Sequence, residues 1–185
     1  MKAWNDWYHA SGHTYGTWLP GDPRGWRSRQ HKRHVEGDYK KPPPPGTDAG
    51  ILRYSHEALR DTPVYLDLPE RCSVGRAMVD MLVEQGIELL ALCQTAIHFH
   101  LLGRFRDPRV RPRVGRAKKH ATFVLHDCGR DGRLWGRKCK VVPIADRQHQ
   151  VNVYQYILRH RNEGGWVWTF RDGITWPTTI HKRPS

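Results

Sequence analysis

Two histidines one residue apart are the first feature of this sequence whose types and spacing could do chemistry. His98 and His100 flank Phe99 in the apolar segment IHFHLL. Residues two apart on a strand point to the same face, so both imidazoles would project together while Phe99 enters the other side. Two histidines on one face of a buried strand are costly unless something uses them, and a divalent metal is the usual user. A hydrogen-bonded pair at a strand end would explain the same residues.

A tyrosine and a third histidine lie in YQYILRHR, residues 154–161, near the end of a predicted helix. Tyr156 and His160 are four positions apart and therefore share a helical face. If that face meets the histidine strand, His160 supplies a third nitrogen and Tyr156 brings a phenol oxygen close to the metal. The alternative is a half-buried core tyrosine and a surface histidine. Tyr154 is the rival tyrosine, but two positions earlier on a helix it faces about 160° away.

The elements that must position these residues follow from apolar periodicity and turn signals. Strands are predicted at 4–19, 87–93, 96–105, 135–142 and 166–170. Helices are predicted at 55–63, opened by Ser55 as N-cap, at 69–85, around 114–125 and at 146–162. This order predicts an α+β fold of the ferredoxin-like type, a split βαβ plan with helices on one face of an antiparallel sheet.

The chain length and local composition set the domain organisation. The 185 residues suit one domain with one modest core. Turn residues, a basic stretch and four consecutive prolines predict an insertion at about 20–50. We expect the domain to span 1–170 and the residues 171–185 to form a loose tail.

The charge of the chain indicates a polyanionic partner. Lysine and arginine number 31 against 18 acidic residues, which gives a net charge of +13 and a pI near 10.0. Nucleic acid is the common partner of such a chain, and the eight tryptophans and seven tyrosines can stack on bases. A basic solubility coat or attraction to acidic lipid is the alternative.

Other compositional features narrow the class of protein. Four cysteines without a CxxC pair argue against a zinc ribbon and against a secreted disulfide scaffold. No stretch approaches the roughly 18 apolar residues that cross a bilayer, and the N-terminus lacks the apolar run of a signal peptide. We therefore expect reduced cysteines, no membrane contact and a cytoplasmic location.

The motifs taken together resemble a known family. A His-hydrophobic-His strand, followed about 55 residues later by a helical Tyr-Ile-x-x-polar motif, is similar to the layout of single-tyrosine HUH transposases. The similarity is strongest to the REP-associated tyrosine transposases and extends to YGTWLPGDPRGW, HVEGDY, GRAKKHATFVL and LWGRK. By this resemblance His98 and His100 match the histidine pair and Tyr156 matches the nucleophile. His160 stands where the family places a further polar ligand, often Gln or Asn.

The resemblance implies an HUH nuclease architecture and a bacterial, nucleoid-associated enzyme. It implies that Tyr156 nicks single-stranded or hairpin DNA, leaving a 5′-phosphotyrosine and a free 3′-OH, with Mg²⁺ or Mn²⁺ as cofactor. Three nitrogen ligands favour Mn²⁺. The family contains both monomers and homodimers. The candidate phosphate contacts are basic residues of the 114–125 helix and the following strand, namely Arg116, Lys118, Lys119, Arg137 and Lys138.

Two other functions remain open at this point. One is a catalytically inactive or domesticated nucleic-acid-binding module of the same fold, which would use the basic and aromatic surfaces without cleavage. The other is a small phosphodiester hydrolase of a histidine-pair type, which usually needs a second HxH or HxT motif. Only the tyrosine nuclease would form a covalent protein–DNA adduct.

Overall fold

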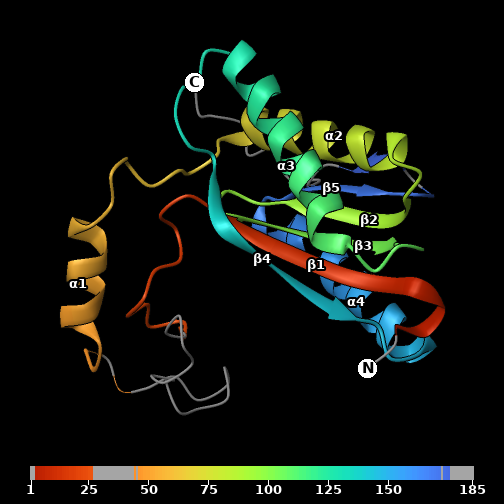
Figure 1. Ribbon diagram of the computed structural model, residues 1–185, viewed down its shortest axis with the longest axis horizontal. Helices are drawn as coiled ribbons and strands as arrows, with labels where there is room; N and C mark the ends of the chain where they lie inside the picture. The colour runs from red at the N-terminus through yellow and green to blue at the C-terminus, as the bar shows by residue number, and fades with distance from the viewer. Residues whose placement is uncertain (1–2, 27–43, 45, 172, 176–185) are drawn as a thin grey trace, which may run out of the picture.

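The computed structural model describes residues 3–26, 44, 46–171 and 173–175, and a single antiparallel sheet lies at its centre (Figure 1). The sheet has six strands in the order β4-β1-β3-β2-β5-β6, and every neighbouring pair is antiparallel. The strands are β1 (Trp7–Thr14), β2 (Glu88–Gln94), β3 (His98–Arg104), β4 (Trp135–Pro143), β5 (Trp166–Thr169) and β6 (Gly173–Thr175). β3 and its neighbour β1 occupy the interior of the sheet, where backbone pairing holds them on both sides.

Two long helices cover one face of the sheet. α2 (Leu68–Glu84) connects β1 to β2, and α3 (Val110–Asp127) connects β3 to β4 (Figure 1). The strand order of this part, β4-β1-β3-β2 with two crossover helices, is the predicted ferredoxin-like split βαβ plan. The main core lies between these helices and the sheet, where Phe99 and Leu101 of β3 meet Val74 and Met78 of α2. The predicted α+β fold is therefore confirmed.

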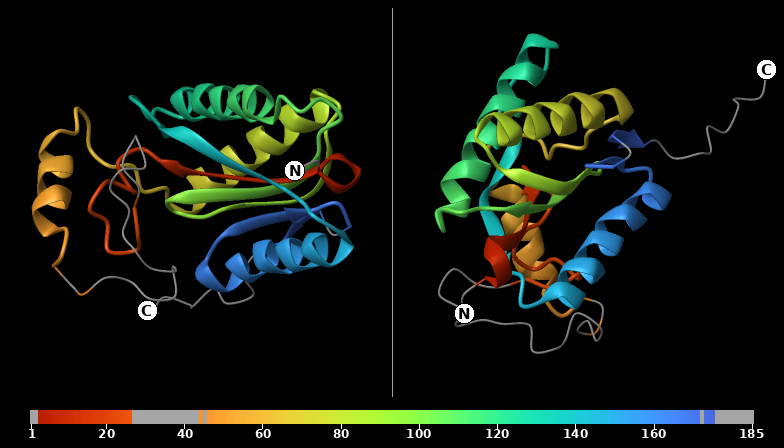
Figure 2. Two further views of the ribbon diagram at one scale, coloured as in Figure 1. Left: turned by 60° about the horizontal axis from the view of Figure 1, so that its bottom comes forward. Right: turned by 90° about the vertical axis from the view of Figure 1, so that its right-hand side faces the viewer.

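The prediction that helices cover one face only is wrong for the last long helix. α4 (Arg147–Arg159), continued by the 3-10 turn η2 (His160–Glu163), lies on the opposite face of the sheet from α2 and α3 (Figure 2). There Val153 and Ile157 of α4 pack with Cys93 and Leu102 in a second apolar cluster. The reason is that β2 and β3 carry apolar side chains on both faces, so each face needs its own cover.

Helix boundaries follow from local chemistry where strong signals exist. At the start of α2 the Asp67 carboxylate accepts from the Glu70 N–H while the Glu70 carboxylate accepts from the Asp67 N–H, a complete capping box. Asp146 caps α4 by accepting from the His149 N–H. The predicted helix opened by Ser55 is wrong, because α1 spans Ala49–Glu57 and contains that serine in its last turn. The chain then reaches Pro63, which disfavours helical backbone just before it.

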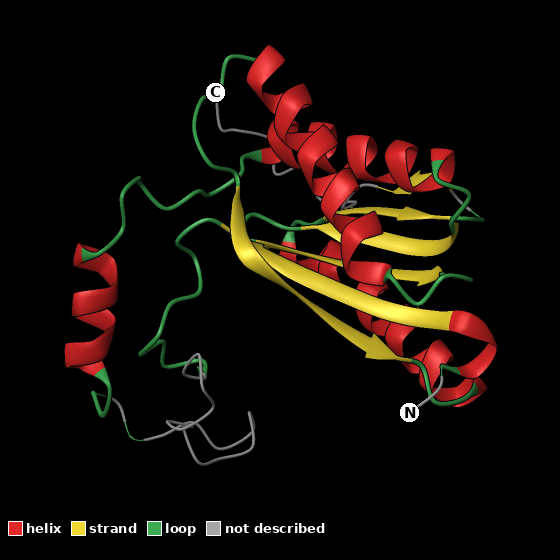
Figure 3. Ribbon diagram, viewed as in Figure 1, coloured by secondary structure: helices red, strands yellow, loops and turns green. Residues whose placement is uncertain are grey.

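Within the segment between β1 and α2, helix α1 stands apart from the layered core, whereas Tyr15, Val64 and Leu66 belong to that core. α1 lies at a distance from the sheet (Figure 3), and Trp26 Nε1 donates to Asp48 Oδ2 at its N-terminus over 2.8 Å. Much of the predicted insertion at 20–50, namely 27–43 and 45, lies outside the described residues.

The C-terminal boundary differs from the prediction. β6 pairs with β5 inside the segment for which the sequence predicted a loose tail, while 176–185 lie outside the described residues. Within the part of the chain that the structure describes, no helix is long and apolar enough to cross a membrane.

Candidate active site

The histidine pair lies near the middle of the sheet, on the face covered by α4. His98 and His100 belong to β3, and their ring centroids are 5.0 Å apart. Phe99 between them is fully buried in the core on the opposite face. Leu102, the next residue on the histidine side, packs in the α4 cluster. The alternation predicted for this segment is therefore present, and it aims both imidazoles at α4.

The end of α4 brings the third histidine and the tyrosine to this pair. The His160 ring is 5.0 Å from that of His98 and 5.1 Å from that of His100, between centroids. The Tyr156 hydroxyl lies 3.3 Å from His100 Nε2. Ligand atoms of the three histidines all lie within 4.8 Å of one another. Tyr154 packs beside the apolar cluster under α4 instead, so of the two tyrosines only Tyr156 has its hydroxyl at the histidines.

A tight glycine turn holds His160 in place. The turn η2 ends at Gly164, whose backbone is left-handed with φ of 72°, a conformation that glycine adopts without strain. The Gly165 N–H donates to the His160 carbonyl over 2.8 Å. A Cβ at Gly165 would lie only 2.7 Å from that carbonyl oxygen, so this close approach also requires glycine. On the His160 ring itself, Nδ1 lies 2.7 Å from Glu163 Oε2.

Burial makes the histidine pair neutral at physiological pH. It lowers the pKa of His98 to about 4, and the charge of His160 adds to the shift. Burial also lowers the pKa of His100 far below its ordinary value, with His9 as the next cause. Both imidazoles therefore keep a free lone pair at pH 7. Burial raises the pKa of Tyr156 above its ordinary value, so its phenol is protonated there.

The three histidines fit a divalent transition metal. Among the described residues, neither Nε2 of His98 nor Nε2 of His160 has a hydrogen-bond partner, although both atoms are buried. A buried polar atom without a partner is costly and calls for an explanation such as an ion. Neutral imidazole nitrogens suit Mn²⁺ better than Mg²⁺, which prefers oxygen ligands. His160 Nδ1 also contacts the Glu163 carboxylate. A metal-binding histidine usually has such an outer partner, a group outside the metal site that accepts the proton of the ring nitrogen that does not bind the metal.

Two further histidines on β1 share this face, and the sequence interpretation missed them. His9 Nε2 lies 2.9 Å from His100 Nδ1. His13 is paired opposite His98 across the β1–β3 ladder, with ring centroids 6.1 Å apart. The signal was available, because positions 9 and 13 have the same parity on a predicted strand and therefore point the same way.

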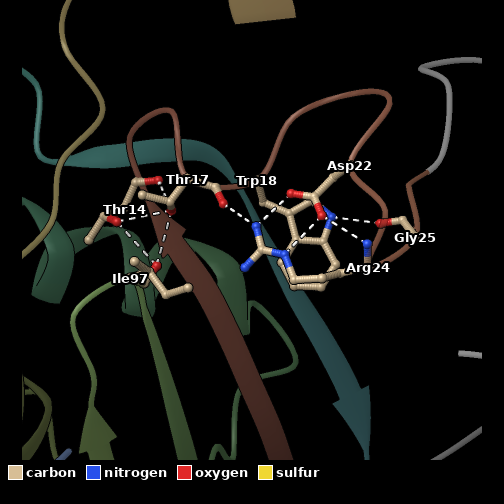
Figure 4. Close-up of polar contacts among 7 residues, drawn as sticks. All are labelled: Thr14, Thr17, Trp18, Asp22, Arg24, Gly25 and Ile97. Atoms are coloured by element: carbon tan, nitrogen blue, oxygen red, sulfur yellow. Dashed lines mark hydrogen bonds and ion pairs between the residues drawn. The ribbon is translucent and has the colours of Figure 1, made fainter. Parts of the chain in front are cut away.

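The loop after β1 supports the start of the histidine strand. Figure 4 shows the polar contacts of Thr14, Thr17, Trp18, Asp22, Arg24, Gly25 and Ile97. The Thr14 and Thr17 hydroxyls donate to the Ile97 carbonyl, directly before His98, over 3.1 and 3.3 Å. Arg24 donates to the Thr17 carbonyl over 2.6 Å and its guanidinium lies over the Trp18 ring. Trp18 in turn packs against His13, with ring centroids 4.6 Å apart. The segment TWLPGDPRG thus holds the end of β1 and the start of β3 in position.

The predicted phosphate contacts do not line the histidine cluster. Arg116 and Lys119 are exposed on α3, which covers the other face of the sheet. The Lys118 ammonium donates to the Gly136 carbonyl over 3.0 Å and lies over the Trp135 ring. Arg137 is exposed on β4, and the side chain of Lys138 lies outside the described residues.

Two other cations lie closer to the site. The Arg159 guanidinium lies 5.9 Å from the centroid of the Tyr156 ring. Lys140 of β4 is paired opposite Ser11, which shares a strand face with His9, and its charge helps to lower the pKa of His9. A bound anion on the histidine face would therefore meet Arg159 and Lys140 before the α3 cations.

Comparisons with known proteins add little to this geometry. No protein-family model matches the chain, and no curated protein matches it. Among solved structures, it is similar to the crystal structure of a putative transposase from Deinococcus radiodurans R1, at 16% identity, over 83% of this chain and 88% of that chain, with a TM-score of 0.37. A TM-score of this size supports no inference, so the function of this chain must come from its own residues. Those residues form a three-histidine cluster, close enough to bind a metal ion, with one tyrosine hydroxyl beside it.

Proposed function

We propose that this chain is a metal-dependent endonuclease and strand-transfer enzyme that acts on single-stranded or hairpin DNA through a 5′-phosphotyrosine. One observation carries the proposal: the Tyr156 hydroxyl lies 3.3 Å from His100 Nε2, at the edge of a three-histidine cluster in which His160 is buried and the other two are half-buried. A tyrosine hydroxyl next to a metal-binding cluster is an arrangement for nucleophilic catalysis at a phosphate. The basic charge of +13 supplies the attraction to a polyanion.

The proposed reaction exchanges one phosphate ester for another. The Tyr156 oxygen attacks the phosphorus, a tyrosine–phosphorus bond forms, and the bond to the 3′ oxygen breaks. The phenolic proton leaves to water, which reaches the 36% exposed tyrosine, and the departing 3′ oxygen takes up a proton. The ester energy is retained, so a second 3′-OH can displace the tyrosine and rejoin strands without ATP.

Each residue of the site has a distinct role in the proposed reaction. His98, His100 and His160 would hold the metal through their Nε2 atoms. When bound, the metal withdraws electron density from a non-bridging phosphate oxygen and makes the phosphorus more electrophilic. Helix α4 keeps Tyr156 and His160 one turn apart, so the attacking oxygen and the third ligand move as one body. Arg159, which lies over the Tyr156 ring, would stabilise the charge that develops on the phosphate.

The test compares the two tyrosines of α4. Each variant, Tyr156→Phe and Tyr154→Phe, is incubated with single-stranded and hairpin oligonucleotides and Mn²⁺, denatured, and analysed for a protein band shifted by covalent DNA. We expect Tyr156→Phe to abolish the adduct and leave DNA affinity nearly unchanged, because only the attacking oxygen is removed. Tyr154→Phe should keep the adduct, because its hydroxyl lies away from the histidines.

The same gel separates the competing functions. An adduct that survives Tyr156→Phe and disappears with Tyr154→Phe would assign the nucleophile to the other tyrosine. DNA binding by the wild-type chain without any adduct would favour an inactive binding module. Cleavage without an adduct, unaffected by either substitution, would favour a hydrolase that uses water.

A further inference from the structure

His9 is a half-buried histidine that the proposed reaction does not use. It lies on β1, and its Nε2 is 2.9 Å from Nδ1 of His100. The two rings are stacked, with centroids 5.1 Å apart, and the Tyr156 ring packs edge-on to His9 at 6.3 Å. Backbone pairing fixes both partners, because β1 and β3 are neighbours through seven paired residues from Trp7 to His13.

The hydrogen bond between the two rings has two possible directions, and they differ in consequence. A neutral imidazole has one N–H donor and one lone-pair nitrogen. If His100 donates from Nδ1, its Nε2 carries a lone pair that faces Tyr156 and the other two histidines. If His9 donates instead, His100 must carry its proton on Nε2, and that nitrogen cannot bind a metal.

Two neighbouring contacts favour the first direction. His100 Nε2 has the Tyr156 hydroxyl 3.3 Å away, and a protonated phenol can donate to a lone pair on that nitrogen. His160 provides a parallel, since its Nδ1 faces the Glu163 carboxylate over 2.7 Å, which accepts the proton and leaves Nε2 for the cluster. Two of the three candidate ligands thus have an outer partner at Nδ1.

We propose that His9 is a positioning residue that accepts the Nδ1 proton of His100 and so holds the Nε2 lone pair of His100 ready for a metal ion. The inference rests on the metal site of the proposed function, but not on DNA cleavage. It adds a member of β1 to a centre built by β3 and the end of α4. Outer partners of this kind orient the ligand ring and fix its tautomer.

The test reads the tautomer and the metal affinity directly. Two-dimensional ¹H–¹⁵N NMR of the metal-free protein at pH 7 identifies which nitrogen of His100 carries the proton. Mn²⁺ affinity is measured from the electron paramagnetic resonance signal of free Mn²⁺. The variants are His9→Phe, which keeps a flat ring without an acceptor, and His9→Gln, whose amide oxygen can accept near the position of Nε2. His13→Phe is the matched control. His13 lies on the same strand and the same face as His9, but it is paired opposite His98 and not beside His100.

We expect His100 to carry its proton on Nδ1 in the wild type, in His9→Gln and in His13→Phe, and to show a mixture of tautomers in His9→Phe. Mn²⁺ binding should weaken about tenfold in His9→Phe, the low end of the range for lost outer partners, and recover most of this in His9→Gln. A His100 proton on Nε2 in the wild type, or equal Mn²⁺ affinity in His9→Phe and wild type, would overturn the proposal.

The outcome is independent of the nuclease activity. If the His9 effect is present but no DNA adduct forms, the inference stands and the proposed function fails. If the adduct forms with Mn²⁺ and the His9 substitution changes neither tautomer nor affinity, the function stands and the inference fails. Circular dichroism of each variant confirms that the fold is intact before either result is interpreted.

Discussion

The candidate ligands are all imidazoles, which bind a metal in their neutral form, and this decides which charge the centre would attract. Three imidazoles lie within ligand distance of one another, and burial holds the pKa of His98 at about 4. A divalent ion held by neutral ligands keeps its full charge, so the site would carry two positive charges until an anion arrives. A phosphodiester supplies that anion, and Arg159 beside Tyr156 adds to the attraction.

Removing a ligand should weaken metal binding in a graded way. His98→Ala deletes one of three nitrogens, and we expect Mn²⁺ binding and adduct formation in Mn²⁺ to fall below detection. His160→Gln should retain part of both, because an amide oxygen can also ligate a divalent ion. Mn²⁺ titration by electron paramagnetic resonance and the covalent-adduct gel measure the two effects. Full adduct formation in excess EDTA would refute the requirement for a metal.

Stability of the metal-free chain should depend on pH through its half-buried histidines. Burial lowers the pKa of His13 and of His98 to about 4, whereas an unfolded histidine titrates near about 6.5. The unfolded chain therefore binds protons more tightly, so these histidines stabilise the fold above about pH 6.5 and lose this contribution as the pH falls toward 4.

Urea unfolding in EDTA at several values between pH 7 and pH 4 measures this dependence. The free energy of unfolding should decrease steadily across that window, and His13→Phe should reduce the slope because it removes one of the titrating groups. A flat profile between pH 6.5 and pH 4.5 would show that the rings are solvated.

At the scale of elements, the packing of α2 against β5 depends on one close contact. Gly75 of α2 lies against the Trp166 ring of β5, and a Cβ there would be 2.1 Å from the nearest ring carbon. Trp166 is 1% exposed and has no room to move away. α2 can therefore approach β5 this closely only with glycine at position 75, and β5 directly follows the turn that holds His160.

Two glycines in long helices offer a matched pair for testing this contact. Gly75→Ala should destabilise the fold by about 1–3 kcal/mol, the usual cost of overpacking a core. Gly115→Ala on α3 should stabilise it by about 0.5–1 kcal/mol, because nothing lies within 4 Å of the added Cβ and alanine has the higher helix propensity. Chemical denaturation measures the change in the free energy of unfolding for each variant. Equal changes in the two variants would contradict the close packing of Gly75 against Trp166.

At the scale of the whole molecule, the charge and the candidate site are distributed differently. The net charge is +13, yet the exposed cations Arg116 and Lys119 lie on α3, across the sheet from the histidine cluster. A DNA strand that touches both the α3 cations and the histidine cluster would have to pass around an edge of the sheet. β4 forms the edge next to α3, and it carries Arg137 and Lys140.

The salt dependence of DNA binding tests this path. Each lost phosphate contact to a single strand should flatten the log–log slope by about 0.7. We expect that change for Lys119→Ala and a smaller one for Lys118→Ala, because the Lys118 ammonium already donates to the Gly136 carbonyl. Fluorescence anisotropy between low and moderate salt measures the slopes. An unchanged slope in Lys119→Ala together with a flatter one in Lys140→Ala would place the strand on the histidine face alone.

Much of the fold and part of the site could be predicted from the sequence because they depend on local periodicity. The alternation in IHFHLL was enough to place His98 and His100 on one face, and the four-residue spacing was enough to put Tyr156 beside His160. For α2, Pro69 at the start and the stop signal Gly86 placed both helix ends to within a residue or two, whereas Ser55 misplaced α1. The order of elements then led to the ferredoxin-like plan, since connections between neighbouring elements are short and regular.

Only the tertiary structure decided which surfaces meet. Local periodicity states that His98, His160 and Tyr156 each have a defined direction, but it does not state that α4 covers the histidine face rather than joining α2 and α3. That choice depends on apolar side chains on both faces of β2 and β3, which bury Val153 and Ile157 of α4 on one side. The bond from His9 to His100 joins residues 91 positions apart, and such a contact follows from strand order and register, which are set by the packing of the whole sheet.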